Sequence, residues 1–428
     1  MADVQEELGF RQCLLPRRFD FTIQNNSTFV AVALLPWARS VGCRIVDSCM
    51  LNECAGCEVA RKLVIHIGAQ KCASSSLQAS LRLYQQSCQG SMEFIFMNPG
   101  QLRRIDRSIA AQAAVDWTYV DRSLAATQSD QVIISHEMLG NRPALVRSLA
   151  ERGLQQHGFD HVTVVGYTRL QSSYHISAFG QWYFRDRKRL RADKQTFAKH
   201  DLLWDRFSAL ERSLFALVLV GQDRGWWGNY RKLRSELSDL GHQVSMASNH
   251  IPTRALPYPL LANFFELAGL RATVDDLAPF DVRKNASFNP IVVHALSVHF
   301  STIGQRESCF PGPHEGNRWL FRVCDRIEDQ SSLTEQMEAV FQSGFSDALV
   351  QQIDHRCSES NLRYCRNMSV EPEYFSPADT GLDRLTADQL IDLAQSTAQQ
   401  RSSDDIQAIN RQADTVLMRA ARAEIIST

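Results

Sequence analysis

The sequence predicts an α/β fold in which helices flank a parallel sheet, followed by a mainly helical C-terminal part. Three observations support this prediction. Short apolar runs rich in β-branched residues alternate with helical patterns in the first two thirds of the chain. The stretch 63–83 passes from such a run through a glycine-containing turn into a helix. From about residue 330 onward the pattern is helical throughout.

The elements follow in chain order from these patterns. Strands are predicted at 63–67, 93–97, 131–135, 161–167, 215–220 and 243–247, as apolar or β-branched runs. Helices are predicted as a pair within 101–128, from 143, after 169, and at 226–240, 260–270, 332–342, 346–365, 386–399 and 403–423.

Composition limits the function classes. The 428 residues, 44% of them apolar, are enough for a large core. A net charge of −1 gives no general attraction to nucleic acid or to an anionic membrane, so we expect neither as a partner. Eleven cysteines in no regular framework favour a reducing compartment. The N-terminus lacks a secretory pattern and the apolar run 29–38 is too short to span a bilayer, so we expect a cytoplasmic protein without a transmembrane segment.

Three regions are expected: a poorly patterned extension at 1–60, the α/β domain at 61–330, and a helical region at 331–428. Four cysteines of the extension are too closely spaced for the usual zinc ribbon, and we expect them to be reduced and to bind no metal. They are Cys43, Cys49, Cys54 and Cys57. The last helices have no assigned role and are candidates for self-association as a homodimer.

The turn after 63–67 contains the residues that indicate a ligand-binding function. It contains Gly68 and Lys71 and leads into three serines at 74–76. Backbone N–H groups, a helix N-terminus and an ammonium directed at one spot suit a phosphate or sulfate, although an ordinary connection with a solvated lysine gives the same pattern. A Walker A loop has a hydroxyl directly after its lysine to bind Mg²⁺. Here that residue is Cys72, which disfavours a nucleoside-triphosphate site.

The same stretch resembles the 5′-phosphosulfate loop of the sulfotransferases that depend on 3′-phosphoadenosine 5′-phosphosulfate (PAPS), commonly H-I-G-x-P-K-T-G-T-T-S-L-Q in bacterial members. The matching residues are His66, Ile67, Gly68, Lys71, Ser76, Leu77 and Gln78, with Ser74 and Ser75 in place of threonines. The chain departs from the pattern at Gln70 for proline, Cys72 for threonine and Ala73 for glycine.

This resemblance implies a P-loop nucleotide-kinase-like sulfotransferase fold. It also implies that the loop binds PAPS as co-substrate. The implied binding residues are Gly68, Gln70, Lys71, Cys72, Ala73, Ser74, Ser75 and Ser76.

Two ionisable residues, His136 and Glu137, follow the predicted strand 131–135. The carboxyl end of a strand in an α/β sheet is where such sheets bind ligands, although a His-Glu pair there also caps helices. In the sulfotransferases the equivalent strand ends at the catalytic base, as K-T-H in cytosolic enzymes and S-S-E in many bacterial ones. This chain has S-H-E. The resemblance favours Glu137 as the base, while the ordinary pKa of an imidazole favours His136 at neutral pH.

Arg169 follows the strand 161–167, and Ser177 follows eight residues later on the predicted helix. By itself this pair indicates nothing more than a surface contact. In the sulfotransferases an arginine and a serine at this spacing, after this strand, bind the 3′-phosphate of the nucleotide. The stretch 169–182 also resembles the bacterial R-R-Q-x-x-x-x-x-S-x-x-x-Q-W pattern.

A second resemblance lies at 282–288, which is similar to the R-x-N-x-S-L stretch of bacterial sulfotransferases. It adds further candidates for nucleotide or active-site contacts: Arg283, Lys284, Asn285 and Ser287.

The sequence therefore predicts a sulfotransferase that moves a sulfuryl group from PAPS to a hydroxyl of a carbohydrate or small metabolite, with no metal. A P-loop-type nucleotide kinase, and a non-catalytic glycan- or nucleotide-binding member of the same fold, are the alternatives. Four aromatic residues are candidates for stacking on the acceptor, although packing explains them equally well: Trp182, Tyr183, Trp226 and Trp227.

Overall fold

The computed structural model describes residues 60–427 except for 70, 89–91, 222–224, 254–256, 283–287, 289, 303–321, 325, 328–329, 342–343 and 376–383. All described residues belong to one compact unit. Several predictions lie outside the described residues. They concern the N-terminal cysteines and, among the candidate site residues, Gln70, Arg283, Lys284, Asn285 and Ser287.

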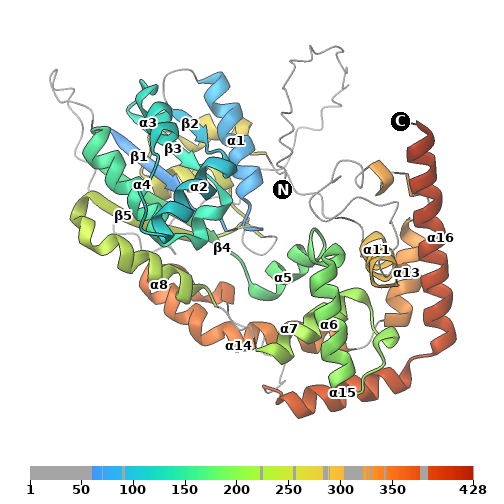
Figure 1. Cartoon of the computed structure of the whole chain (residues 1–428). Helices are drawn as coiled ribbons and strands as arrows, with labels where there is room; N and C mark the ends of the chain where they lie inside the picture. Colours follow the sequence, from blue (N-terminus) through green and yellow to red (C-terminus); the bar gives the residue numbers. More distant parts are fainter. Residues whose placement is uncertain are drawn as a thin grey trace, which may run out of the picture. The chain divides into compact units, whose positions relative to one another are not determined.

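The described strands form a five-stranded parallel sheet in the order β2-β3-β1-β4-β5 (Figure 1). The strands are β1 (Lys62–His66), β2 (Glu93–Phe96), β3 (Gln131–Ser135), β4 (His161–Thr168) and β5 (Val244–His250). At the carboxyl end of the central strand, His66 pairs in register with Ser135 and with Val165. The segments that follow β1 and β3 therefore start side by side, while β4 continues for three more residues beyond Val165 to Thr168. The predicted α/β class with a parallel sheet is confirmed.

Helices cover both faces of this sheet, as its apolar strands require. α4 (Pro143–Gln156) and α8 (Trp226–Leu237) contact each other, and α4 packs on β1 and β4. α9 (Leu260–Ala268) and α1 (Ser74–Ser87) likewise contact each other, and α9 packs on β4 and β5. The remaining helices before residue 303 are α2 (Pro99–Ala110), α3 (Thr118–Ala125), α5 (Gln171–Phe179), α6 (Arg187–Lys199), α7 (Ala209–Val220), α10 (Val274–Leu277) and α11 (Pro290–Thr302).

The prediction of a strand at 215–220 is wrong, because this run is the second half of α7. Ser208 and Glu211 begin the helix with a capping box, in which the Ser208 hydroxyl accepts from the Glu211 N–H at 3.2 Å and Glu211 Oε2 accepts from the Ser208 N–H at 2.8 Å. The residues from Ala209 to Val218 are buried on nearly all sides, apart from Leu210. A helix buried all round shows no amphipathic period, and its apolar run reads like a buried strand.

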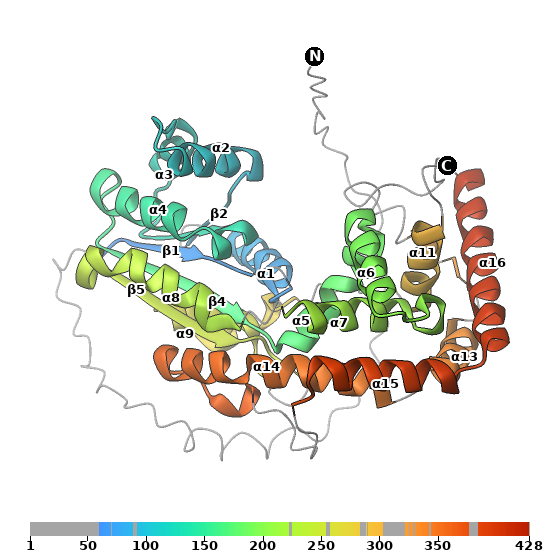
Figure 2. The same cartoon turned by 60° about the horizontal axis from the view of Figure 1, so that its bottom comes forward.

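The C-terminal part is helical, as predicted. It consists of α13 (Gln330–Phe341), α14 (Gly344–Met368), α15 (Ala387–Gln400) and α16 (Ser403–Ser427). Figure 2 shows α14 running beneath α5 and α7, and it contacts both, as well as α8. Self-association through α15 and α16 stays a prediction. In the described part of the chain, no helix is both long and apolar enough to cross a bilayer.

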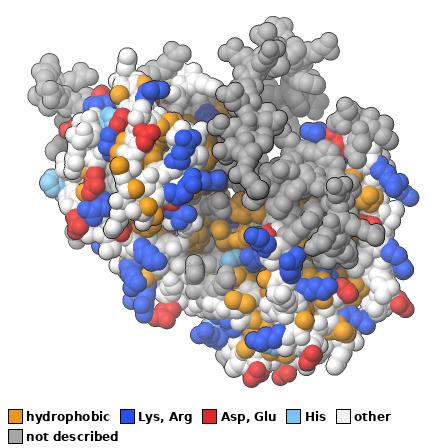
Figure 3. Space-filling view, in the orientation of Figure 1, with side chains coloured by type: hydrophobic (Ala, Val, Ile, Leu, Met, Phe, Trp, Pro, Cys, Tyr) orange, Lys and Arg blue, Asp and Glu red, His pale blue; other side chains and the backbone are white. Residues whose placement is uncertain are grey.

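The surface carries both signs of charge. Figure 3 shows Lys and Arg side chains spread over one face, with Asp and Glu among them. This mixture agrees with the formal net charge of −1.

A buried ion pair joins α7 to the junction of α15 and α16. Arg401 Nη2 donates to Glu211 Oε1 at 2.7 Å and Nη1 donates to Oε2 at 2.9 Å, and the two side chains are 5% and 0% exposed. Arg401 also donates to the carbonyl of Phe341 at 2.9 Å, and Ser346 donates to Glu211 at 3.1 Å. The pair therefore ties α7, α13 and α14 to the junction of α15 and α16.

We predict that Arg401→Met lowers the free energy of unfolding by about 3–5 kcal/mol, because it leaves the Glu211 carboxylate buried without its cation. Glu211→Gln combined with Arg401→Met should regain most of this loss. The matched control is Arg363→Ala, in an exposed pair with Glu359, which should cost about 1 kcal/mol or less. Urea unfolding followed by circular dichroism measures all three. Equal losses for the single and double variants would contradict the prediction.

Candidate functional site

The loop between β1 and α1 has a tightly constrained path. A Cβ on Gly68 would lie 2.0 Å from Ser74 Oγ and 2.7 Å from the His66 ring, so only glycine fits there. Lys71 and Ala73 both have positive φ, at 66° and 59°. The turn is closed by the Cys72 N–H and the Ser74 hydroxyl, which donate to the Ala69 carbonyl at 3.1 and 3.2 Å.

Positive φ in two non-glycine residues is a strained backbone of the kind that gathers at functional sites. Ala73 adopts the left-handed conformation, which glycine adopts without strain and which is uncommon for a residue with a Cβ.

A buried polar network supports the loop from below. Gln78 Nε2 donates to Ser135 Oγ at 3.0 Å, and Ser135 Oγ lies 2.7 Å from His66 Nδ1. Burial lowers the pKa of His66 to about 3, so its ring is neutral at physiological pH and hydrogen-bonds with the Ser135 hydroxyl through Nδ1. His66 ends β1, Ser135 ends β3 and Gln78 belongs to α1. The network thus fixes these three elements where the loop begins.

Lys71 is held at the site rather than being solvated. Its Nζ lies 4.7 Å from the centroid of the Trp182 ring, a cation–π contact. Burial lowers the pKa of Lys71 to about 8, with Arg169 lowering it further and Glu137 opposing the change. The ammonium remains mostly protonated at neutral pH. Trp182, considered above for stacking on an acceptor, packs on this lysine.

The two candidates for the base point to different places. Glu137 begins a short 3₁₀ helix, Glu137–Asn141, and accepts from the Ser75 hydroxyl at 3.5 Å. Burial raises the pKa of Glu137, while Lys71 and Ser75 lower it. His136 instead accepts from the Met138 N–H at 3.1 Å, and its ring lies 5.5 Å from that of Phe96 at the end of β2. Only the carboxylate is therefore tied to the loop.

Arg169 lies beside the same loop. Its Nη1 donates to the Lys71 carbonyl at 3.3 Å, and its own carbonyl accepts from Trp226 Nε1 at 2.6 Å. Trp226, only 8% exposed, is thus a packing residue. Among the described residues, Arg169 pairs with no carboxylate.

For His136, the other candidate base, burial lowers the pKa of the imidazole, and Arg103 adds to this effect.

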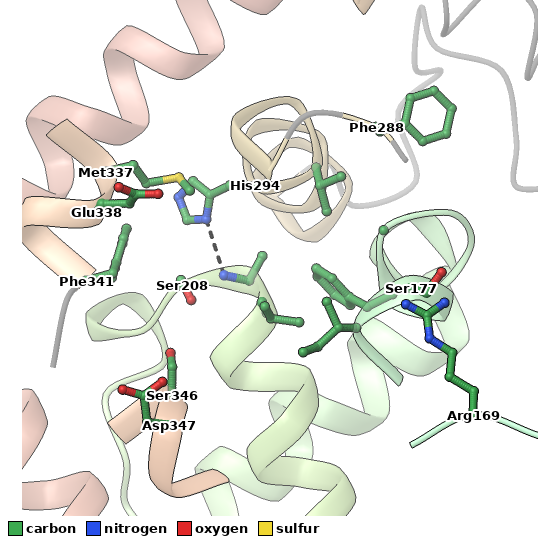
Figure 4. A pocket seen from close by; sticks show the side chains of 16 residues that line it. Arg169, Ser177, Ser208, Phe288, His294, Met337, Glu338, Phe341, Ser346 and Asp347 are labelled. Atoms are coloured by element: carbon green, nitrogen blue, oxygen red, sulfur yellow. Dashed lines mark hydrogen bonds between the residues drawn. The ribbon is translucent and has the colours of Figure 1, made fainter. Parts of the chain in front are cut away.

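Arg169 and Ser177 line one cavity of about 580 Å³. Figure 4 shows both side chains at one end of it. A second hollow of about 280 Å³ is bordered by the end of the loop. Its lining comes from the loop, from the segment after β5 and from the segment before residue 283, and includes Ala73, Ser76, Ile251, Tyr258 and Val282.

The structure thus brings together Lys71, Ser75, Glu137 and Arg169, with Ser177 at the adjoining cavity. Gly68 and Ser74 shape the turn. Cys72 is fully buried, and burial raises the pKa of its thiol to about 12, so it presents no anionic ligand group. The arrangement as a whole places two cations and one carboxylate around a strained turn.

Two contacts to α14 were missed by the sequence reasoning. Asp354 accepts from the Ser172 N–H at 2.9 Å and from its hydroxyl at 2.6 Å, which caps the start of α5. Gln171 and Asn361 exchange two amide hydrogen bonds of 2.8 and 2.7 Å. These hydrogen bonds fix the start of α5, which lies between Arg169 and Ser177 in the sequence. No local pattern signals them, because the partners lie more than 180 residues apart.

Comparison with protein-family models, with curated proteins and with solved structures gave no match for this chain.

We predict that Glu137→Gln lowers the pKa of Lys71 below its value of about 8, because the carboxylate favours the ammonium form. A pH titration of the lysine side chains by NMR, with the Lys71 signal assigned from Lys71→Arg, measures this shift. Glu151→Gln, on α4 and paired with Arg147, serves as the control and should leave the value unchanged. An unchanged or higher Lys71 pKa in Glu137→Gln would contradict the prediction.

Proposed function

We propose that the chain is a PAPS-dependent sulfotransferase, which moves a sulfuryl group from PAPS to an acceptor hydroxyl. One observation carries the proposal: Lys71 and Arg169 are adjacent cations at a strained loop that follows the central strand, with Arg169 bonded to the carbonyl of Lys71. Such a site suits a ligand with more than one anionic group. The resemblance of 66–78 and 169–182 to sulfotransferase motifs supports PAPS as this ligand.

The residues present fit the donor. The 5′-phosphosulfate would lie on the loop with Lys71, and the 3′-phosphate would be held by Arg169 and Ser177, which line one cavity. Among the described residues, Ser177 makes no side-chain hydrogen bond, so its hydroxyl is available for a phosphate oxygen.

The proposed step is an in-line displacement. The acceptor oxygen forms a bond to sulfur while the bond between sulfur and the 5′-phosphate oxygen breaks, and that oxygen keeps the electron pair. Glu137 takes the hydroxyl proton, for which its raised pKa makes it a better base. The Lys71 ammonium and the loop N–H groups stabilise the charge on the leaving phosphate. His136, turned toward Phe96, is the weaker candidate for the base.

The kinase alternative is disfavoured by Cys72, a buried thiol where a Walker A loop has the hydroxyl that binds Mg²⁺. The non-catalytic alternative retains the same nucleotide contacts and differs only in turnover.

The test measures binding of 3′-phosphoadenosine 5′-phosphate (PAP) by calorimetry in EDTA, and then transfer from labelled PAPS to a panel of hydroxyl acceptors. We expect metal-independent binding, and turnover that Lys71→Ala abolishes without a change in the circular dichroism spectrum. Binding that requires Mg²⁺ would favour the kinase. Binding without turnover on any acceptor would favour the non-catalytic protein, and full activity in Lys71→Ala would refute the assigned role of the lysine.

We further predict that Arg169→Ala weakens PAP binding by about 1.5–3 kcal/mol, on the order of tenfold to a hundredfold. Lysine should restore only part of this affinity, since it lacks the guanidinium fork. The loss should be specific: binding of adenosine 5′-phosphate, which lacks the 3′-phosphate, should hardly change. Arg363→Ala, on the exposed face of α14, is the matched control. Equal weakening of both nucleotides would mean that Arg169 has a structural role only.

A further inference from the structure

The cavity of about 580 Å³ beside Arg169 has the size of a typical small-molecule site and mostly apolar walls. Its walls come from α5, α7, α11 and α13 and include Ile176, Phe179, Leu210, Val293 and Phe341. Apolar walls of this extent do not suit a carbohydrate, which needs hydrogen-bonding partners along its length.

Three polar side chains that line the cavity, His294, Ser208 and Ser346, already form hydrogen bonds within the protein. His294 accepts from the Ala209 N–H at 3.2 Å through Nδ1, and its Nε2 lies 2.7 Å from Asn410 Oδ1. Ser208 accepts from the Glu211 N–H, and Ser346 donates to Glu211. The cavity walls therefore present mainly hydrocarbon surface to a ligand.

The two ends differ in charge. Arg169, without a carboxylate partner among the described residues, and Ser177 lie at one end. Two exposed acidic residues, Glu338 and Asp347, lie at the other end, as Figure 4 shows. A ligand with one anionic group is therefore oriented, with that group at Arg169 and its apolar part along the cavity.

We propose that this cavity binds an anionic amphiphile: a molecule with a single anionic head held by Arg169 and Ser177 and a flexible hydrocarbon body between α5, α7, α11 and α13. Because the head occupies the position given above to the 3′-phosphate, the amphiphile and the sulfuryl donor exclude each other. This competition rests on the proposed function, whereas binding in the cavity does not.

The first experiment measures binding of dodecanoate to the full chain by calorimetry. Shortening the chain to decanoate should weaken binding about tenfold, at roughly 0.8 kcal/mol for each methylene group removed from the cavity. Dodecan-1-ol, which lacks the charge, should bind at least tenfold more weakly, and so should dodecanedioate, whose second carboxylate meets hydrocarbon or the acidic end. Equal affinity for dodecanoate and decanoate would overturn the proposal.

Variants locate the site. Arg169→Ala should weaken dodecanoate about tenfold to a hundredfold. Met337→Trp fills the cavity from α13 and should abolish dodecanoate binding, while PAP binding is retained because the nucleotide uses the Arg169 end. Glu338→Gln should improve dodecanedioate binding, and Glu335→Gln, an exposed residue on the same helix outside the cavity, should not. Undiminished dodecanoate binding in both Arg169→Ala and Met337→Trp would place the fatty acid elsewhere and overturn the proposal.

A competition experiment separates the two proposals. PAP should raise the apparent Kd of dodecanoate by a factor of one plus the ratio of the PAP concentration to the Kd of PAP, as expected for two ligands that exclude each other. Dodecanoate binding without any PAP binding would refute the proposed function and leave the cavity assignment intact. Simultaneous, independent binding of both would rule out a shared position at Arg169. The Arg169→Ala variant then decides between the two proposals, because undiminished dodecanoate binding in it would overturn the placement of the anionic head, whereas undiminished PAP binding would overturn that of the 3′-phosphate.

Discussion

The close contact of Gly68 with Ser74 and His66 is the constraint on which the rest of the site depends. No side chain fits at Gly68, so the chain leaves β1 along one path, and it must then enter α1 through two residues of positive φ, Lys71 and Ala73. Each such residue costs on the order of 1–2 kcal/mol. The cost is tolerated because His66, Ser135 and Gln78 lock β1, β3 and α1 around the turn. The strained backbone of the loop is thus maintained by the packing of the sheet and α1 around it.

The second constraint acts on the turn from β4 into α5, which hydrogen-bonds with residues of α14, far along the chain. Asp354 caps α5 through Ser172, and Asn361 pairs with Gln171 while also accepting from the Trp226 N–H at 3.4 Å. Burial raises the pKa of Asp354, while its hydrogen bonds with Ser172 oppose the change. The helical C-terminal part therefore contributes directly to the orientation of Arg169. A truncation before α14 would release that turn even though every motif of the α/β part remained.

Strong local patterns in the sequence predicted much of the fold. The parallel strands, α1 and the C-terminal helices each have a clear period or a clear turn at their start. The strand predicted at 215–220 is wrong because α7 is buried nearly all round, which removes the period of 3.6 residues from its sequence. The capping box of Ser208 and Glu211 is the local signal that marks this segment as a helix. In the site, the sequence indicated Lys71, Glu137 and Arg169 but not their environment. The Trp182 ring over Lys71 and the Asp354 cap arise only from tertiary packing, which no local pattern encodes.

The electrostatics of the site follow from this packing. Arg169 lowers the pKa of Lys71 although the protein itself holds the two residues together through the Lys71 carbonyl. Glu137 offsets part of the repulsion, yet burial raises its own pKa and weakens that compensation. Two cations against one partly compensating carboxylate leave the free site with excess positive charge in a partly desolvated place. An anionic ligand relieves the repulsion and, by favouring the ammonium, raises the pKa of Lys71 as it binds. The arrangement of charges at the loop therefore favours a ligand that carries negative charge.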